Sequence, residues 1–371
     1  MTTTAGGRSA QDVTAEALGL AVAAQVPVLL WGAPGTGKTS AIRAMADVAG
    51  LPCETVIAAI REPSDFSGLP VVVDGVVHFA PPRWAERLGR AGRGVLFLDE
   101  ISTAPPAVQA ALLRVVLERV VGDLDLPDGV VVVAAANPPE QAADGWDLSA
   151  PLANRFCHLD WHVEPAAFAM GLAGGFPAPP VAALPADWED HLPLGRGLVS
   201  AFVSVRPALT VDVPSDAARA GRAWPSPRTW ELAARLWTAA TTAEASADAR
   251  AALVVGTVGD AAGLQFLTWL HEQDLPDPED VLADPASFVV PDRPDRTYAL
   301  LAAVAAAVAA RPSPERWTAG WRVLARVGET SPDVAAVAAR TLARCRPPDA
   351  VVPPEVKLFA PMLRDAGLLG T

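Results

Sequence analysis

Lysine is nearly absent from this chain, and the position of one lysine is informative. Only Lys38 and Lys357 occur among the 29 basic residues, and arginine supplies the rest. Lys38 lies in a glycine-containing stretch, WGAPGTGKTS, that runs from Trp31 to Ser40. A chain that uses arginine almost everywhere else has therefore kept a lysine beside glycines.

The chain also lacks an excess of positive charge. Its formal net charge is −13, and its sequence pI is about 4.8. Proteins that bind bulk DNA or anionic membranes usually carry a basic footprint. We therefore expect no nucleic-acid partner, although a local basic patch is not excluded by the overall charge.

Features of secreted and membrane proteins are scarce as well. The three cysteines, Cys53, Cys157 and Cys345, are scattered and odd in number, which suits a reducing compartment better than a disulfide framework. The first residues, MTTTAGGRSAQD, have neither the basic nor the apolar region of a signal peptide. The longest apolar run, 299–310, is too short to cross a bilayer. We expect no membrane insertion and a cytoplasmic location.

The glycine-containing stretch matches a phosphate-binding pattern. The pattern Gly-x-x-x-x-Gly-Lys-Thr is met by Gly32, Gly37, Lys38 and Thr39. The apolar residues 26–30 before it predict a buried strand, and residues 39–48 after it predict a helix. Glycines allow backbone N–H groups to surround a phosphate at the start of a helix, where the helix field favours an anion.

The residue types in the loop also suit a nucleotide with its metal. Lys38 would neutralise charge on the β- and γ-phosphates, and the Thr39 hydroxyl would bind Mg²⁺. The expected contacts with ATP are Gly32, Pro34, Gly35, Thr36, Gly37, Lys38, Thr39 and Ser40. The alternative is an ordinary strand–turn–helix, which needs neither the lysine nor the threonine.

Two further strands end in polar side chains. The apolar run VLFLDE, 95–100, ends in Asp99, which would hold Mg²⁺ through water, and Glu100, which would orient or deprotonate the attacking water. The run VVVVAAA, 130–136, ends at Asn137, whose amide could position water near the γ-phosphate. Each feature alone has a plain alternative: exposed acids at a strand end, or a turn before proline. Their order after the glycine loop favours the nucleotide site.

These motifs resemble those of the AAA+ ATPases and, within them, the MoxR-type group. The resemblance is carried by GAPGTGKT, VLFLDEIS, AAANPPE, LANRF and WPSPRTW, which span residues 31–230. It implies an α/β fold: a P-loop αβα core with a parallel sheet, followed by an all-helical lid and, in this chain, a helical C-terminal extension. It also implies ATP and Mg²⁺ as ligands, and hydrolysis of ATP at interfaces between subunits.

By the same resemblance, Arg155 in LANRF matches the arginine finger that reaches a neighbouring subunit's nucleotide. Arg61, Arg83 and Arg114 are rivals for that role, and Arg155 could instead cap a helix end. In WPSPRTW, Arg228 matches the sensor-2 arginine that contacts ATP phosphate, in its own subunit or in its neighbour's. Because a cation is disfavoured in the first turn of a helix, a compensating anion is expected near Arg228.

The pattern along the chain predicts three domains. Residues 1–210 are expected to form the nucleotide-binding core, with an inserted β-hairpin at about 61–84. Residues 211–291 are expected to form the lid, and 292–371 the extension. The Gly-, Pro- and Ala-rich stretch 171–187 is interpreted as a linker or loop. The hairpin resembles one that lines a pore or faces substrate in this branch, or it is a plain surface hairpin.

Three functions are compatible with these features. The first is a homo-oligomeric ATPase, expected as a hexameric ring, that remodels, matures or assembles a separate protein partner. In the resembling group such partners often carry a von Willebrand factor A domain. The second is a nucleotide-gated switch with little turnover, which the presence of Glu100 disfavours. The third is a DNA-translocating motor, which the acidic balance disfavours. His158 and His162 are interpreted as structural residues rather than metal ligands.

Overall fold

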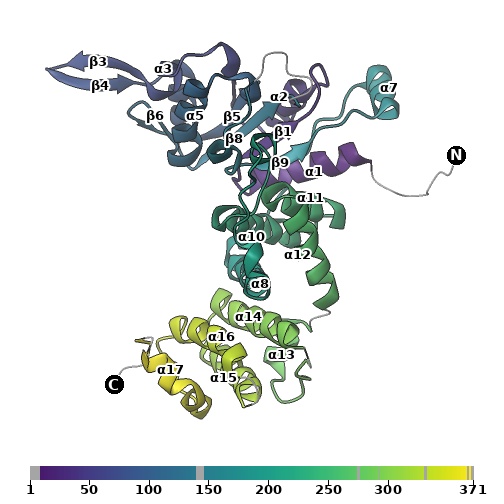
Figure 1. The fold of residues 1–371 in the computed structure, drawn as a ribbon, viewed down its shortest axis with the longest axis vertical. Coiled ribbons are helices and arrows are strands. Elements are labelled where there is room, and N and C mark those ends of the chain that lie inside the picture. Colours follow the sequence, from purple (N-terminus) through teal and green to yellow (C-terminus); the bar gives the residue numbers. More distant parts are fainter. Residues whose placement is uncertain are drawn as a thin grey trace. The chain divides into compact units, whose positions relative to one another are not determined.

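The computed structural model describes residues 9–138, 146–273, 276–291, 293–329, 332–365 and 367–368 (Figure 1). The chain divides into two compact units, Met1–Leu184 with Val211–Gly263, and Pro185–Thr210 with Leu264–Thr371. These units do not coincide with the three segments expected from the sequence, whose status as domains stays a prediction. The last residues of the AAANPPE motif, Pro139 and Glu140, lie outside the described residues.

The first unit contains a parallel sheet of five strands in the order β2-β5-β8-β1-β9. The strands are β1 (Val28–Trp31), β2 (Cys53–Ile57), β5 (Arg93–Asp99), β8 (Gly129–Ala136) and β9 (Cys157–Asp160). All four pairings are parallel. β8 is buried on both faces, as its continuous apolar run predicts. This sheet, together with a helical C-terminal part, confirms the predicted α/β fold class.

Helices cover both faces of the sheet (Figure 1). Those of the first unit are α1 (Ala10–Ala23), α2 (Lys38–Val48), α3 (Ser64–Ser67), α4 (Arg83–Ala91), α5 (Pro106–Glu118), α6 (Ala150–Ala153), α7 (Pro165–Gly174), α9 (Ala217–Ala220), α10 (Pro227–Thr242) and α11 (Ala247–Val258), with short 3-10 turns η1 (Ala58–Ile60) and η2 (Ile101–Thr103). The stretch 171–187, interpreted from the sequence as a linker, begins inside α7. The glycines and prolines of this stretch favoured a loop, so the sequence did not predict the helix. The helix starts at Pro165, and proline is preorganised for the first helical position.

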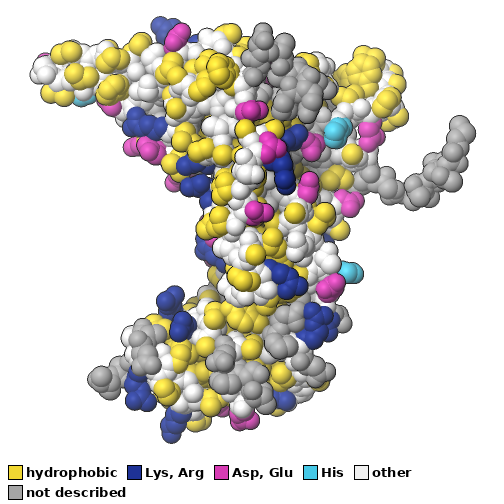
Figure 2. All heavy atoms as spheres, in the orientation of Figure 1, with side chains coloured by type: hydrophobic (Ala, Val, Ile, Leu, Met, Phe, Trp, Pro, Cys, Tyr) yellow, Lys and Arg dark blue, Asp and Glu magenta, His cyan; other side chains and the backbone are white. Residues whose placement is uncertain are grey.

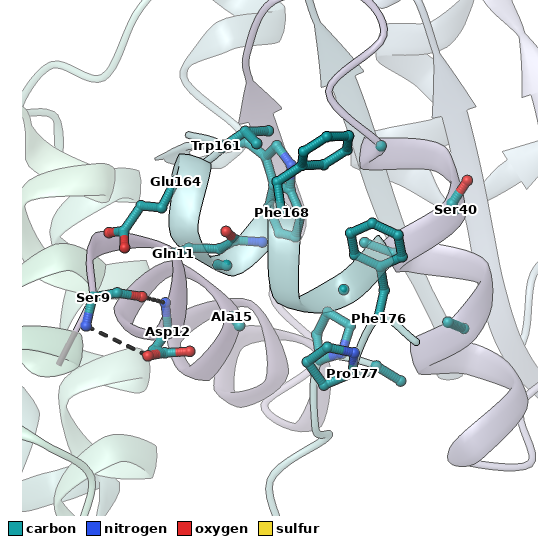
Figure 3. Close-up of a pocket in the computed structure, with 18 of the residues that line it drawn as sticks. Ser9, Gln11, Asp12, Ala15, Ser40, Trp161, Glu164, Phe168, Phe176 and Pro177 are labelled. Atoms are coloured by element: carbon teal, nitrogen blue, oxygen red, sulfur yellow. Dashed lines mark hydrogen bonds between the residues drawn. The ribbon is translucent and has the colours of Figure 1, made fainter. Parts of the chain in front are cut away.

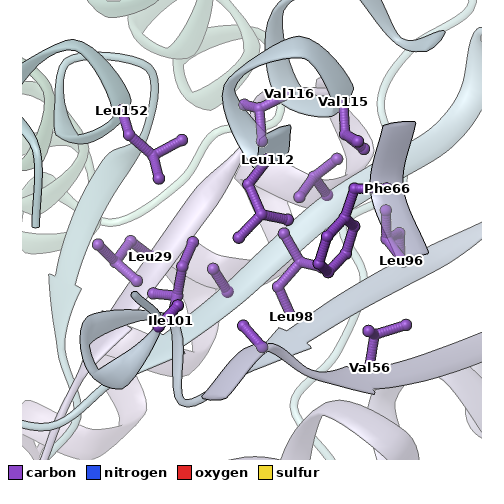
Figure 4. Close-up of a cluster of buried hydrophobic side chains, with 14 of the residues drawn as sticks. Leu29, Val56, Phe66, Leu96, Leu98, Ile101, Leu112, Val115, Val116 and Leu152 are labelled. Carbon is purple, nitrogen blue, oxygen red and sulfur yellow. The ribbon is translucent and has the colours of Figure 1, made fainter. Parts of the chain in front are cut away.

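One apolar cluster joins α3, α4 and α5 to the sheet (Figure 4). Phe66 of α3 packs beside Leu112 and Val115 of α5, over Leu96 and Leu98 of β5. The apolar positions of α5 recur at helical spacing, so the buried stripe that the sequence predicts for this helix is confirmed. The cluster anchors the strand whose end carries Asp99.

The inserted hairpin consists of β3 (Leu69–Val73) and β4 (Val76–Ala80), paired antiparallel. Asp74 and Gly75 form the connection with φ of 52° and 78°, as a two-residue hairpin turn requires. Every residue of β3 is exposed, and Val72 is 73% exposed. Figure 2 shows apolar side chains over much of this hairpin. A second, shorter hairpin is formed by β6 (Val120–Val121) and β7 (Leu124–Asp125).

The second unit is helical. It contains α8 (Leu192–Val205), α13 (Pro278–Ala283), α14 (Pro294–Ala310), α15 (Pro314–Gly328), α16 (Pro332–Arg344) and α17 (Ala360–Asp365), with 3-10 turns η4 (Trp188–His191), η5 (Pro207–Leu209) and η6 (Pro354–Phe359). The helix α12 (Asp260–Gln273) begins in the first unit and ends in the second. Trp317 and Trp321 of α15 lie at the centre of the core of this unit. In the described part of the chain, no helix combines the length and apolar character that a bilayer crossing needs.

Candidate functional site

The residues that the sequence predicts for the phosphates and the metal meet at one edge of the sheet. Strands β5, β8 and β1 are neighbours, and all three run in the same direction. Asp99 ends β5, Asn137 follows β8, and the glycine loop follows β1. Parallel strands bring their carboxyl ends to a common edge, where ligands of open α/β sheets bind.

Lys38, the first residue of α2, is buried although it is charged. Its side chain is 7% exposed. Its Nζ donates hydrogen bonds to the carbonyl oxygens of Gly32 at 2.6 Å and Ala33 at 3.0 Å, and to Oδ1 of Asn137 at 3.2 Å. Burial lowers the pKa of Lys38, and the negative charges of Asp99 and Glu100 oppose that shift. The ammonium group is thus held in a fixed position at the helix start.

A hydroxyl and a carboxylate adjoin this lysine. Thr39 Oγ1 donates a 2.7 Å hydrogen bond to Oδ2 of Asp99, and Oδ1 of Asp99 accepts from the backbone N–H of Glu100 at 3.0 Å. Oxygen ligands of this kind are those that Mg²⁺ takes from proteins, usually with waters and phosphate oxygens completing its shell. The residues present therefore fit a magnesium nucleotide, with Thr39 and Asp99 beside the metal and Lys38 beside the phosphates.

Glu100 has an unusual backbone conformation. Its φ is 56°, in the left-handed region, and β5 ends one residue earlier than the predicted run 95–100. A side chain in this region costs about 1 kcal/mol or more, and such positions cluster at functional sites. Glu100 is exposed, so its carboxylate is accessible to water.

Asn137 is held by a residue that the sequence reasoning missed. Ser102, in η2, is 5% exposed, and its Oγ accepts from the backbone N–H of Asn137 at 3.2 Å and lies 3.4 Å from its carbonyl oxygen. With Lys38 bonded to the Asn137 amide, the end of β8 is anchored on two sides. The only sequence signal for Ser102 is its place at the end of VLFLDEIS.

The glycine loop is also supported by Trp161, a residue that the sequence analysis did not assign to the site. Gly35 and Gly37 have φ of 76° and 84°, which glycine adopts without strain. A Cβ on Gly32 would lie 2.7 Å from the carbonyl oxygen of Trp161. The Trp161 indole Nε1 donates to the carbonyl oxygen of Thr36 at 3.1 Å. Trp161 therefore supports the loop, and nothing in its local sequence indicates this.

The glycine loop forms part of the lining of a large cavity (Figure 3). Its volume is about 1380 Å³, and its lining includes Gly35, Thr36 and Ser40. Phe168 of α7 and Phe176 lie with ring centroids 5.9 Å apart and project into it. Apolar walls with a few polar groups are typical of sites for small organic ligands. The cavity offers room beyond the phosphate loop for the rest of a nucleotide.

Arg155 and Arg228 lie apart from the lysine group: within the ranges that the structure describes, no hydrogen bond joins either arginine to Lys38, Thr39, Asp99 or Asn137. Arg155 follows α6, and Arg228 is in the first turn of α10. Burial lowers the pKa of Arg155, and the charge of Arg228 lowers it further, so the two cations lie close enough to repel. In the described residues, neither has a carboxylate within 4.0 Å. The rivals Arg61 and Arg114 are instead paired, with Asp65 at 4.0 Å and Glu118 at 3.1 Å.

His158 is structural. Its Nδ1 accepts from Trp31 Nε1 at 2.9 Å, and its Nε2 lies 2.9 Å from the carbonyl oxygen of Ala153. Burial lowers its pKa to about 4, so it is neutral at physiological pH. His162 lies beyond the end of β9 and is exposed. Among the residues described, no group of three or more possible ligands is placed to hold a metal ion.

Part of the chain matches a family of known proteins. Residues 27–158 match the ATPase family associated with various cellular activities, AAA. The chaperone MoxR1 of Mycobacterium tuberculosis is 32% identical over 134 residues, which are 35% of this chain and 34% of MoxR1. The pathogenicity locus probable regulatory protein WtsA of Pantoea stewartii subsp. stewartii is 33% identical over 122 residues, 31% of this chain and 38% of WtsA.

The chain thus spans well under half the length of these two relatives. Among solved structures, a full-length MCM homolog from Methanopyrus kandleri is similar with a TM-score of 0.38 and 15% identity, over 69% of this chain and 54% of that one.

Proposed function

We propose that this chain, whose residues 27–158 match the AAA family of ATPases and which is similar to the chaperone MoxR1, is a MoxR-type AAA+ ATPase. In this proposal it hydrolyses ATP at interfaces between its own copies and uses the reaction to remodel, mature or assemble a separate protein. The observation that carries the proposal is the hydrogen-bonded group of Lys38, Asn137, Thr39 and Asp99 at one sheet edge. That group provides a cation, an amide, a hydroxyl and a carboxylate where the glycine loop meets a helix N-terminus.

Each residue of this group has a distinct role in the proposal. Lys38 binds the β- and γ-phosphates, and Asn137, fixed by Ser102, orients the attacking water. Mg²⁺, when bound beside Thr39 and Asp99, neutralises charge on the phosphates. Glu100 orients or deprotonates the water, a role that its exposed carboxylate beside the metal ligands suits.

The cavity beside the loop is proposed to hold the nucleoside end of ATP. Its wall contains the rings of Phe168 and Phe176, against which a base can pack. Gln11 of α1 also lines the cavity (Figure 3), and its Oε1 is buried and has no hydrogen-bond partner among the described residues. An unsatisfied buried oxygen is costly, and a donor on the ligand would satisfy it.

The site is proposed to be completed by a neighbouring subunit. Arg155 and Arg228 have no counter-ion among the described residues, and a pair of cations of this kind suits a phosphate. We assign Arg155 as the residue that acts on the neighbour's nucleotide, in a homo-oligomeric ring for which six subunits is the expected number. Arg228 is proposed to contact ATP phosphate, in its own subunit or in its neighbour's.

The protein partner is proposed to meet the exposed hairpin β3–β4. Seven large apolar side chains are exposed on this hairpin, more than a surface element without a partner usually carries: Leu69, Val71, Val72, Val73, Val76, Val77 and Phe79. A partner with a von Willebrand factor A domain is one candidate, by resemblance alone. The cytoplasm, as the proposed location, suits a chain whose three cysteines are all free.

The test is ATP hydrolysis measured against protein concentration, with light scattering on the same samples. Turnover per subunit should rise as the chain assembles, and Glu100→Gln should lower it about 100-fold or more while ATP binding is kept. Arg155→Ala should lower turnover in assembled samples to a similar degree. Asp125→Asn, which removes an exposed carboxylate from β7, is the matched control and should leave turnover unchanged.

A nucleotide-gated switch is the competing function. If wild-type protein binds ATP tightly but shows no turnover at any concentration, the switch is supported and the ATPase proposal is wrong for the chain alone. Strong DNA binding that weakens steeply with salt would instead support a DNA motor.

A further inference from the structure

Asn154, the residue before Arg155, is almost completely buried, with 2% of its surface exposed. Its Nδ2 donates to the carbonyl oxygen of Trp224 at 3.1 Å, and its Oδ1 accepts from the hydroxyl of Ser226 at 2.8 Å. A carbonyl oxygen can only accept, so the contact with Trp224 fixes which end of the amide faces it. The buried amide thus joins the turn after α6 to the segment that leads into α10.

Ser226 is at the same time the N-cap of α10. Its Oγ accepts from the backbone N–H of Thr229 at 3.2 Å, so the hydroxyl that donates to Asn154 also fixes the first turn of the helix. Arg228 lies in that turn. One unbroken set of hydrogen bonds therefore runs from the residue beside Arg155 to the helix turn that carries Arg228.

The residues before Arg155 are connected by hydrogen bonds to β1, the strand that leads into the glycine loop. The carbonyl oxygen of Ala153 lies 2.9 Å from His158 Nε2, and the His158 ring accepts from Trp31, the last residue of β1. The guanidinium of Arg155 itself donates to the carbonyl oxygen of Pro151, in the preceding helix α6. The backbone at Arg155 is thus held from two directions, while its charge is left for an outside partner.

We propose that Asn154 is a positioning residue for ATP hydrolysis, whose two buried hydrogen bonds hold Arg155 at a fixed place relative to Arg228. The proposal rests on the function proposed above, in which Arg155 acts on the nucleotide of the neighbouring subunit. The long arginine side chain can reach a phosphate productively only from a fixed backbone. The two bonds of the buried amide join the segment that carries Arg155 to the segment that carries Arg228.

The test uses mixed oligomers of two inactive chains. Lys38→Ala chains lose the nucleotide site but keep Arg155, whereas Arg155→Ala chains keep the nucleotide site but lose the arginine. In a mixed oligomer, Arg155 of a Lys38→Ala chain can act on the nucleotide of a neighbouring Arg155→Ala chain, so part of the turnover should return. Asn154→Ala should lower kcat about 10- to 100-fold, as small misplacements of a catalytic group do, with KM unchanged. Its turnover should be restored by Lys38→Ala chains and not by Arg155→Ala chains.

Ser226→Gly is the second variant: it removes the hydroxyl that bonds to Asn154, and glycine in place of a capping serine costs a helix only a few tenths of a kcal/mol. As with Asn154→Ala, its turnover should be restored by Lys38→Ala chains and not by Arg155→Ala chains. This variant keeps the test valid if Asn154→Ala does not fold. Thr238→Val is the matched control: Thr238 is a buried residue of α10 whose hydroxyl bonds only within the helix, to Ala234. Its kcat should equal that of the wild type.

Each other outcome overturns the inference in a recognisable way. Wild-type kcat in Asn154→Ala, or restoration by Arg155→Ala chains, shows that Asn154 does not act through Arg155, while the ATPase proposal stands. Failure of the reference pair, Lys38→Ala with Arg155→Ala, to recover any turnover shows that Arg155 does not act between subunits, and both proposals fall.

Discussion

Thr39 and Asp99 are joined by a 2.7 Å hydrogen bond between the second residue of α2 and the last residue of β5. The two residues are 60 positions apart in the chain. The bond places a hydroxyl and a carboxylate oxygen side by side at the point where α2 begins. In the proposed function, these two oxygens would hold Mg²⁺ beside the phosphates of ATP.

Asp99→Asn should therefore weaken magnesium use rather than nucleotide binding. The amide keeps an oxygen that can accept from Thr39 but removes the charge that attracts the metal. The Mg²⁺ concentration for half-maximal turnover should rise about 10- to 100-fold, the usual cost of losing an outer partner of a metal. A magnesium titration of ATPase activity measures this shift, and binding of a fluorescent ATP analogue without Mg²⁺ should be unaffected. An unchanged titration would remove Asp99 from the site.

Gly32→Ala should displace the glycine loop through a steric clash. The added methyl group would lie 2.7 Å from the Trp161 carbonyl oxygen, so the loop or β9 must shift. The unfolding free energy should fall by about 1–3 kcal/mol, the range for overpacked sites, and ATP affinity should fall with it. Urea unfolding and ATP titration measure the two effects.

Gly174→Ala is the matched control for this substitution. A Cβ at Gly174 meets no atom within 4 Å, and Gly174 does not have the positive φ that would strain alanine. Stability and ATP affinity should both stay at the wild-type level. Equal behaviour of the two alanine variants would contradict the close approach of Trp161 to the loop.

His158 should make the stability of the protein depend on pH. Burial lowers its pKa from 6.5 to about 4 in the folded chain. Between these values the unfolded chain binds a proton that the folded chain does not. The contribution of His158 to the free energy of unfolding is therefore complete above about pH 6.5. As pH falls toward 4, this contribution is lost, by up to about 1.4 kcal/mol per pH unit.

His158→Gln isolates this effect. A glutamine can accept from Trp31 and donate to the Ala153 carbonyl oxygen, but it does not titrate. Urea unfolding of both proteins at about pH 7 and about pH 5 measures how much the free energy of unfolding falls on acidification. This fall should be smaller for the variant, because glutamine takes up no proton when the chain unfolds. Parallel losses in the two proteins would show that other groups, and not His158, control acid stability.

The exposed hairpin should tolerate polar side chains. Val72 and Val77 face each other across β3 and β4, and replacing both with serine should change the unfolding free energy by no more than about 1 kcal/mol, since only a cross-strand pair is lost. Val132→Ser, in the buried strand β8, should cost more than about 2 kcal/mol because it buries an additional polar group and loses packing.

Basal ATP turnover of the doubly substituted hairpin should equal that of the wild type. The hairpin is proposed to meet a partner and carries none of the residues assigned to ATP. Phosphate release in the absence of a partner provides the measurement. A large fall in basal turnover would instead indicate that the hairpin helps copies of the chain to assemble.

The sequence alone determined the parts of this protein that are contiguous. The glycine loop, the strand ending in Asp99 and the strand ending at Asn137 were each predicted from a few consecutive residues, because strand periodicity and phosphate-loop chemistry are local. Parallel strands bring such ends together, so the meeting of Lys38 with Asn137, 99 positions away, followed from the fold class.

Only the tertiary structure decided which distant side chains support that site. Trp161 reaches Thr36 across 125 positions, and Asn154 reaches Ser226 across 72. A tryptophan or an asparagine in a short local pattern is equally suited to a core or a turn. Which carbonyl or hydroxyl satisfies each buried polar group depends on how the helices and the sheet pack, since burial in the folded chain is what makes the partner necessary.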